Sequence, residues 1–245
     1  MGWKISLVLI ENKAQFLNDV LLLQKAGFRS IELVDVVDFE TALGAKDTIC
    51  IGEVKDTIVI CDAYKLTEFY LSDTATLELT ESEKNISALF PNSEIVSVAC
   101  HSVVDFHGYS LIQNGIKTRF KMVSPEEKKE YGVRFEEEKK IYNDAITVEN
   151  ELFWNLDGSD DPEEYYSESQ MMEEFTFGVA KRRLGVVLNL KESKTVLQTK
   201  NFRAYKVGEF TEAIKKENAG FKIWKRILFY IVVFLIYQAI KYYNR

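Results

Sequence analysis

The clearest alternation of apolar and polar side chains in this chain lies between residues 94 and 124. Two runs rich in β-branched and aromatic residues meet there at Asn114-Gly115. Asn-Gly is the dipeptide that best fits a two-residue type I′ turn, because both central positions of that turn need positive φ. The sequence therefore predicts an antiparallel hairpin, preceded by a buried strand from Glu94 to Cys100.

The register of this hairpin predicts which side chains share a face. A two-residue loop pairs Gln113 with Ile116, and it would pair Tyr109 with Phe120 farther along. One face is then expected to be buried, and it carries His107, Tyr109, Leu111, Ile116, Phe120 and Met122. The opposite face is expected to be exposed to water, and it carries Ser110, Lys117, Arg119 and Lys121.

The rest of the first 190 residues alternates strands and helices and then clusters its strands in the middle. Apolar runs predict strands at residues 5–10, 31–37, 48–54, 57–61 and 186–190. Helical spacing, caps and glycine stops predict helices at residues 12–26, 63–71, 80–90 and 168–184, with a short helix or turn at 38–43. The expected fold class is α/β or α+β, a mixed β-sheet with flanking helices plus a C-terminal hydrophobic helix.

The C-terminal run Ile227–Ile240, ILFYIVVFLIYQAI, contains Gln238 as its one polar side chain. As a helix it would span only about 21 Å, which is shorter than the roughly 30 Å hydrocarbon core. Aromatic and cationic residues flank it on both sides, however, so residues 224–243 together could reach across a bilayer. We expect a membrane span; the alternative is a helix buried in protein or sealing an oligomer.

Charge divides the chain into an acidic body and a basic end. The whole chain has a net charge of −7, but residues 191–245 hold 12 Lys/Arg against 4 Asp/Glu. No basic footprint dominates the body, which argues against nucleic-acid binding. The expected organisation is a globular domain at 1–190, a basic connector at 191–220 and the hydrophobic segment at 221–245. More cations precede the apolar run than follow it, so the domain is expected on the cytoplasmic side of a membrane; the alternative is a cytoplasmic protein.

The sequence offers one group of residues with catalytic potential: Cys100, His101, Asp105 and His107. A histidine oriented by a carboxylate is the usual general base, and Asp105 and His107 are expected on one face. Cys100 and His101 are expected on opposite faces of one strand, which weakens a cysteine–histidine pair. A structural His–Asp pair and a metal site are the other interpretations of this group. The sequence contains no phosphate loop, nucleophile elbow or zinc motif, so no cofactor and no metal are expected.

The three cysteines are odd in number and stand in strand-like runs, at Cys50, Cys61 and Cys100. Their spacing matches no zinc or redox motif. The sequence therefore predicts buried free thiols in a reducing compartment.

The segment Cys100–Phe106, the hairpin with Asn114-Gly115 and Arg119, and the later Gly132 to Glu136 resemble an uncharacterised bacterial family, a domain of unknown function. The run from Phe175 to Gly185 does so too. This resemblance covers about residues 3–190 and implies no activity or site. The function expected from the sequence is a non-enzymatic domain, tethered to a membrane and acting on an unknown protein partner. The alternative is an enzyme of unknown substrate that uses Asp105 and His107.

Overall fold

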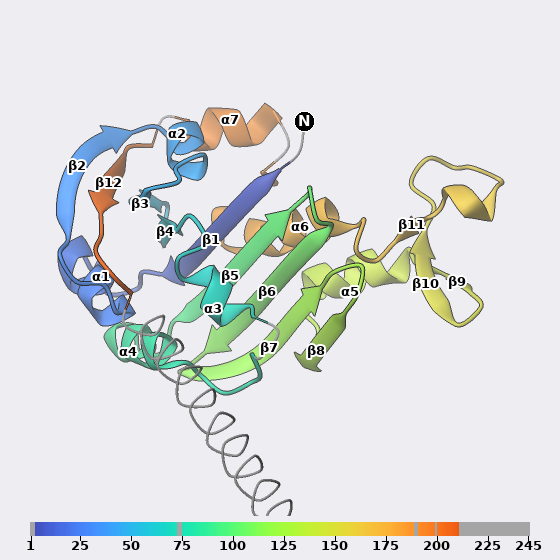
Figure 1. Ribbon diagram of the computed structural model, residues 1–245, viewed down its shortest axis with the longest axis horizontal. Helices are drawn as coiled ribbons and strands as arrows, with labels where there is room; N and C mark the ends of the chain where they lie inside the picture. The colour runs from blue at the N-terminus through green and yellow to red at the C-terminus, as the bar shows by residue number, and fades with distance from the viewer. Residues whose placement is uncertain (1–2, 73–74, 189–190, 199, 211–245) are drawn as a thin grey trace, which may run out of the picture.

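The computed structural model describes residues 3–72, 75–188, 191–198 and 200–210, and it is built around one large sheet (Figure 1). In order across the sheet, the strands are β2 (Glu32–Val37), β12 (Phe202–Lys206), β3 (Thr48–Val54), β4 (Thr57–Cys61), β1 (Lys4–Glu11), β5 (Glu94–His101), β6 (Phe106–Gln113), β7 (Ile116–Val123) and β8 (Lys128–Gly132). Every pairing within it is antiparallel. The expected combination of a sheet with flanking helices is confirmed, but the sheet is antiparallel rather than mixed.

Helices cover both faces of the sheet and divide the core into two layers. One face packs against α1 (Asp19–Ala26), α3 (Thr67–Tyr70) and α4 (Glu81–Leu89). The other packs against α2 (Phe39–Leu43), α5 (Glu136–Asn143), α6 (Met172–Leu184) and α7 (Lys191–Leu197). Strand β1 shows the reason, because Leu7 and Leu9 enter one layer while Val8 and Ile10 enter the other. A strand that is apolar on both sides needs a cover on both sides.

Local signals place most of the helix ends. Thr80 and Glu83 form the predicted capping box at the start of α4. Gly27 ends α1 with φ 108°, and Gly185 ends α6 with φ 75°. Only a residue without a Cβ adopts that left-handed backbone at little cost, so both glycines act as helix stops.

Two predicted helices are shorter than the apolar spacing suggested, because side chains hold the preceding backbone in turns. Asn12 bonds the amide and the carbonyl of Phe16, and the helix begins only at Asp19. Asp62 accepts hydrogen bonds from the amides of Leu66 and Thr67, so α3 begins at Thr67. Residues 186–188 form no strand.

The central hairpin has the predicted turn but a different register beyond it. Gln113 pairs with Ile116, as expected. A bulge then shifts the pairing so that Leu111 lies opposite Arg119, and Thr118 becomes the extra residue on β7. The predicted faces are therefore wrong on β7, because a one-residue slip moves each later side chain to the other side of the sheet.

The bulge carries the cations of β7 into the interior. Phe120 and Met122 join the layer of α1, α3 and α4, whereas Tyr109 and Leu111 join the layer of α5 and α6. Ile116, expected to be buried, is 66% exposed. Ser110 and the three cations Lys117, Arg119 and Lys121, expected in water, are at most 2% exposed.

The last strand enters the sheet from the far end of the sequence. Residues 191–206, expected in a connector, supply α7 and β12, and β12 lies between β2 and β3. Arg203 binds Asp19 of α1, and Phe210 packs its ring against Phe28 and Phe69. The folded unit therefore extends to Phe210.

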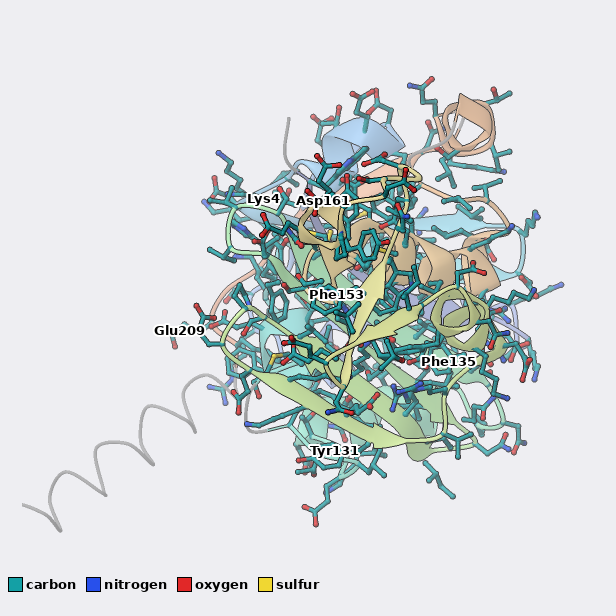
Figure 2. All side chains as sticks on the ribbon, turned by 90° about the vertical axis from the view of Figure 1, so that its right-hand side faces the viewer. Lys4, Tyr131, Phe135, Phe153, Asp161 and Glu209 are labelled. Atoms are coloured by element: carbon teal, nitrogen blue, oxygen red, sulfur yellow. The ribbon has the colours of Figure 1, made fainter. Side chains whose placement is uncertain are left out.

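A small sheet projects from one end of the molecule, beyond β8 (Figure 1). It consists of β9 (Ile146–Val148), β10 (Glu151–Trp154) and β11 (Tyr166–Ser167), with a 3-10 turn at Pro162–Glu164. Figure 2 views the molecule from this side, with Phe153 labelled on β10. Trp154 joins the small sheet to the core, since it is buried and its Nε1 donates to the carbonyl of Ile141 at 2.8 Å.

The predicted membrane segment, residues 224–243, lies outside the described residues. Among the helices of the described part, none is long and apolar enough to cross a bilayer.

Candidate functional site

The four residues with catalytic potential lie at one end of β5 and β6. Cys100 on β5 lies opposite His107 on β6, and both are buried. His101 pairs with Phe106 and Lys4, and its ring neighbours that of Tyr64. Asp105 stands in the connecting turn with φ 43°. In the described part of the chain, no hydrogen bond or ion pair joins Asp105 to either histidine, so the expected His–Asp pair does not form.

The environment of His107 and Cys100 keeps both side chains uncharged. Burial and then the nearby Lys121 ammonium lower the pKa of His107 to about 3, although the Glu168 carboxylate and the Ser169 backbone act in the opposite direction. Burial likewise raises the pKa of the Cys100 thiol to about 12. The uncharged imidazole of His107 stacks on the ring of Phe175, with 5.3 Å between the ring centres. All three cysteines are buried and free, as the sequence predicted.

Arg119 forms the centre of a buried ionic cluster under α5. Its guanidinium contacts both carboxylate oxygens of Glu138, at 2.7 to 3.2 Å, and reaches Glu130 at 2.8 Å. Glu138 also accepts hydrogen bonds from the Tyr109 hydroxyl at 2.6 Å and from the amide of Phe135 at 2.9 Å. Phe135 is the N-cap of α5, which begins at Glu136. Arg119 and Glu138 are at most 1% exposed. A buried charge is tolerated only with such complete pairing, so this contact fixes α5 on the sheet.

Lys121 forms a second buried contact, beneath the start of α6. Its Nζ lies 2.5 Å from Glu168 and 2.6 Å from the Tyr142 hydroxyl, and 3.7 Å from the centre of the Phe175 ring. Lys128 of β8 approaches the same carboxylate at 2.6 Å. Glu168 stands between β11 and α6, so the contact joins the small sheet, α5 and α6 to the edge of the main sheet.

Both members of this pair are ionised at neutral pH. Burial lowers the pKa of Lys121 to about 8, although Glu168 opposes the shift. Burial alone would raise the pKa of Glu168, but Lys121 and Lys128 lower it to about 2. On the other face of the sheet, Lys117 pairs with Glu83 of α4 at 2.8 Å, and both side chains are buried there too.

The packing of α5 against α6 leaves a groove of about 620 Å³ on their outer side. The helices run antiparallel, because Glu137 at the start of α5 contacts Arg182 near the end of α6 at 3.3 Å. The apolar part of the groove is lined by Ile141, Phe177, Gly178 and Val187. A Cβ at Gly178 would lie 3.4 Å from Cδ1 of Ile141, so the missing side chain keeps this stretch open.

Charged residues form the rim of this groove, which we call the α5–α6 groove. They are Glu137, Lys140, Glu173, Glu174, Lys181 and Arg182. Arg182 also holds the two carboxylate oxygens of Glu94 on β5 at 2.7 and 2.8 Å, which fixes the end of α6 to the sheet. The arrangement is therefore an apolar depression between two immobilised helices, suited to burying an apolar side chain of another molecule.

Sequence reasoning missed both the ionic cluster and the groove. The available signal for the cluster was the number of cations on one strand that also carries buried apolar residues. Their partners Glu130, Glu138 and Glu168 lie 11 to 47 residues away from them in sequence. In the described part, no group of three or more His, Cys, Asp or Glu side chains is placed to hold a metal ion.

Comparisons with protein-family models, with curated proteins and with solved structures found no match to this chain.

Proposed function

We propose that this chain is a protein-interaction module that is held at the cytoplasmic face of a membrane by its C-terminal apolar segment. The observation that carries the proposal is the α5–α6 groove, with its apolar lining and charged rim. Concave sites with an apolar lining and a few polar side chains are the usual form of a binding site for another molecule.

The bracing of the groove supports a role in binding. Arg119–Glu138 holds α5 from below, Lys121–Glu168 holds the segment that leads into α6, and Arg182–Glu94 holds the end of α6. A surface that is rigid before binding loses less conformational entropy when a partner docks. Because these three contacts fix both helices, the groove keeps its shape before a partner docks.

The membrane part of the proposal rests on the sequence of residues 224–243. Phe210, the last described residue, is fixed between Phe28 and Phe69 and stands 17 positions before Ile227. An extended chain covers at most about 3.5 Å per residue, so the domain could stand up to roughly 60 Å from the start of the apolar run. That reach leaves the groove accessible to a partner in the cytoplasm or on the membrane surface.

Photo-crosslinking in isolated membranes tests the interaction. The variant Lys181→p-benzoylphenylalanine places the crosslinker on the exposed rim of the groove, and Lys84→p-benzoylphenylalanine places it on the exposed side of α4 as a matched control. We expect a discrete protein adduct from position 181, absent from position 84 and lost when Gly178→Gln fills the groove. Adducts of equal yield at both positions, or an adduct that survives Gly178→Gln, would refute the proposal.

A further inference from the structure

The main sheet has two edges, and they differ in how they meet solvent. Edge strand β8 carries Lys128, Lys129 and Glu130, and charged side chains of this kind are the usual protection of an edge against pairing with another strand. Edge strand β2 lies at the opposite rim of the molecule (Figure 1). In the described part of the chain, no strand pairs with the outer side of β2.

Strand β2 exposes apolar side chains where β8 exposes charged ones. Leu33 and Val36 are 54% and 53% exposed. Leu33 lies opposite Tyr205 and Val36 lies opposite Arg203, and both of these β12 residues bond to Asp19 of α1. Because opposite residues of a sheet share a face, Leu33 and Val36 lie together on the α1 side of the edge. An apolar edge of this kind favours the addition of a further strand.

The backbone turns the same two residues outward. The Gly208 amide donates to the carbonyls of residues 29 and 30 at 2.8 and 3.2 Å, so the even-numbered residues of β12 face β2. Their partners on β2 are Glu32, Asp35 and Val37. Leu33 and Val36 therefore direct their amides and carbonyls away from β12. In agreement, the Val36 amide donates to the side chain of Asp35 at 2.7 Å.

A bulge sets the spacing of these outward positions. The pairing with β12 shifts at Val34, which leaves Leu33 and Val36 three residues apart. A regular strand presents its groups at every second residue, so it matches only one of the two positions. A second copy of β2 has the same three-residue step. Laid antiparallel, it brings its Val36 opposite Leu33 and its Leu33 opposite Val36.

The charges of β2 also fit this register. Glu32 then meets Val37 of the second copy, and Asp35 meets Val34 of the second copy, so no acidic residue opposes another. A slide of one residue in one direction sets the two Asp35 side chains opposite each other. A slide of two residues in the other direction sets Glu32 opposite Asp35. Like charges directly opposite each other destabilise a sheet, so they disfavour both alternatives.

We propose that this chain forms a symmetric dimer through β2. The two copies of the strand pair antiparallel, join the two sheets into one, and pack Leu33 of each copy against Val36 of the other. The Val36 amide exchanges the Asp35 carboxylate for a carbonyl of the second strand. This surface lies at the other end of the sheet from the α5–α6 groove, so the dimer is independent of the proposed function.

Sedimentation velocity of the full-length chain in detergent micelles tests the dimer. We expect a dimer that dissociates on dilution. The variant Leu33→Lys/Val36→Lys gives β2 the protection that β8 has, and it should weaken dimerisation about tenfold or more. The matched control is Val103→Lys/Val104→Lys, which replaces two exposed apolar residues in the turn before β6 and should leave dimerisation unchanged. Circular dichroism checks that both variants are folded.

Disulfide crosslinking tests the register separately. Leu33→Cys with an affinity tag is mixed with Val36→Cys without one, and copper phenanthroline in air oxidises the thiols. We expect the mixed disulfide to form about fivefold faster than a disulfide in either variant alone, because only unlike positions lie opposite each other. The wild-type chain, whose three cysteines are buried, gives the background rate.

A full-length chain that stays monomeric at every concentration would overturn the proposal. So would a dimer that survives Leu33→Lys/Val36→Lys, as one formed by the C-terminal segment would. Equal crosslinking rates in mixed and single samples would overturn the antiparallel register, and this result decides the matter if the lysine variant does not fold. Loss of the photo-adduct at position 181 would remove the proposed function without affecting any of these measurements.

Discussion

Glu138→Gln tests the buried ionic contact that holds α5, since the amide keeps the size of the carboxylate but removes its charge and replaces one acceptor oxygen by an NH2 donor. Arg119 then retains Glu130, which is itself 30% exposed, and the carbonyl of Tyr131 at 3.2 Å. Breaking a buried ion pair by removing one partner costs about 3–5 kcal/mol. Because Glu130 and the Tyr131 carbonyl remain as partners of Arg119, we expect a loss at the lower end of this range, about 3 kcal/mol of the free energy of unfolding.

The assay is urea unfolding followed by the fluorescence of tryptophan, to which buried Trp154 beside α5 contributes a local signal. A loss of about 3 kcal/mol corresponds to a fall in the melting temperature of about 6–12 °C in a domain of this size. The matched control is Glu136→Gln on the same helix, which breaks an exposed pair with Lys139. Its unfolding midpoint should stay at the wild-type value.

A double-mutant cycle separates the ion pair from other effects of the substitution. Arg119→Met alone leaves a buried carboxylate with the Tyr109 hydroxyl and the Phe135 amide, and it should also destabilise the chain. Combined with Glu138→Gln it removes both charges of this pair, so neither is left buried without its partner. The double variant should therefore be more stable than the sum of the two losses by at least about 2 kcal/mol. Strict additivity, or a Glu138→Gln variant within about 1 kcal/mol of wild type, would refute the reasoning.

Three further predictions concern other parts of the fold. His107 has a pKa of about 3 in the folded chain against an ordinary value of 6.5, so the free energy of unfolding falls as the pH falls from 6.5 toward 3. His107→Leu should reduce this fall between pH 7 and 4.5, measured as urea unfolding midpoints; the same pH dependence in both proteins would contradict it. Gly132 has φ 82°, and Gly132→Ala would place a Cβ 2.0 Å from the carbonyl oxygen of Thr118, whereas Gly158 has φ 68° and open space around it. Gly132→Ala should therefore lower the melting temperature far more than Gly158→Ala, and equal melting temperatures would contradict this. A chain ending at Gly220 should unfold cooperatively in a urea titration followed by circular dichroism. A chain ending at Lys200 lacks β12, which lies between β2 and β3, and should show no cooperative transition.

The sequence predicted those parts of the fold that depend on local physical rules. The Asn114-Gly115 turn, the capping box at Thr80 and the glycine stops at Gly27 and Gly185 all stand where the pattern placed them. Each depends on backbone conformations or hydrogen bonds within a few residues, so a short stretch of sequence contains the necessary information.

The features that failed depend on contacts between distant residues. The bulge at Thr118 changes the register of β7, and Gly132 of the neighbouring strand lies directly against it. Alternation alone assigned Arg119 and Lys121 to water, because the glutamates that make their burial tolerable come from later elements. The place of β12 between two early strands is likewise set by the whole sheet and not by its own five residues.

The candidate site shows the same division. Spacing correctly separated Cys100 from His101 on β5. It also suggested contact between Asp105 and His107, but Asp105 stands in the turn before β6 and not on the strand that carries His107. The α5–α6 groove could not be found, since its lining comes from two helices whose relative position depends on the ionic contacts beneath them.

The function proposed here requires that the domain works at a membrane surface. Carbonate extraction of membranes, with the full-length chain beside a version ending at Gly220, measures this most directly. Because the shorter version retains every described element, including β12, only the C-terminal segment differs between the two. We expect the full-length chain to stay in the membrane pellet and the shorter version to be released. A full-length chain that is recovered entirely in the supernatant would contradict it.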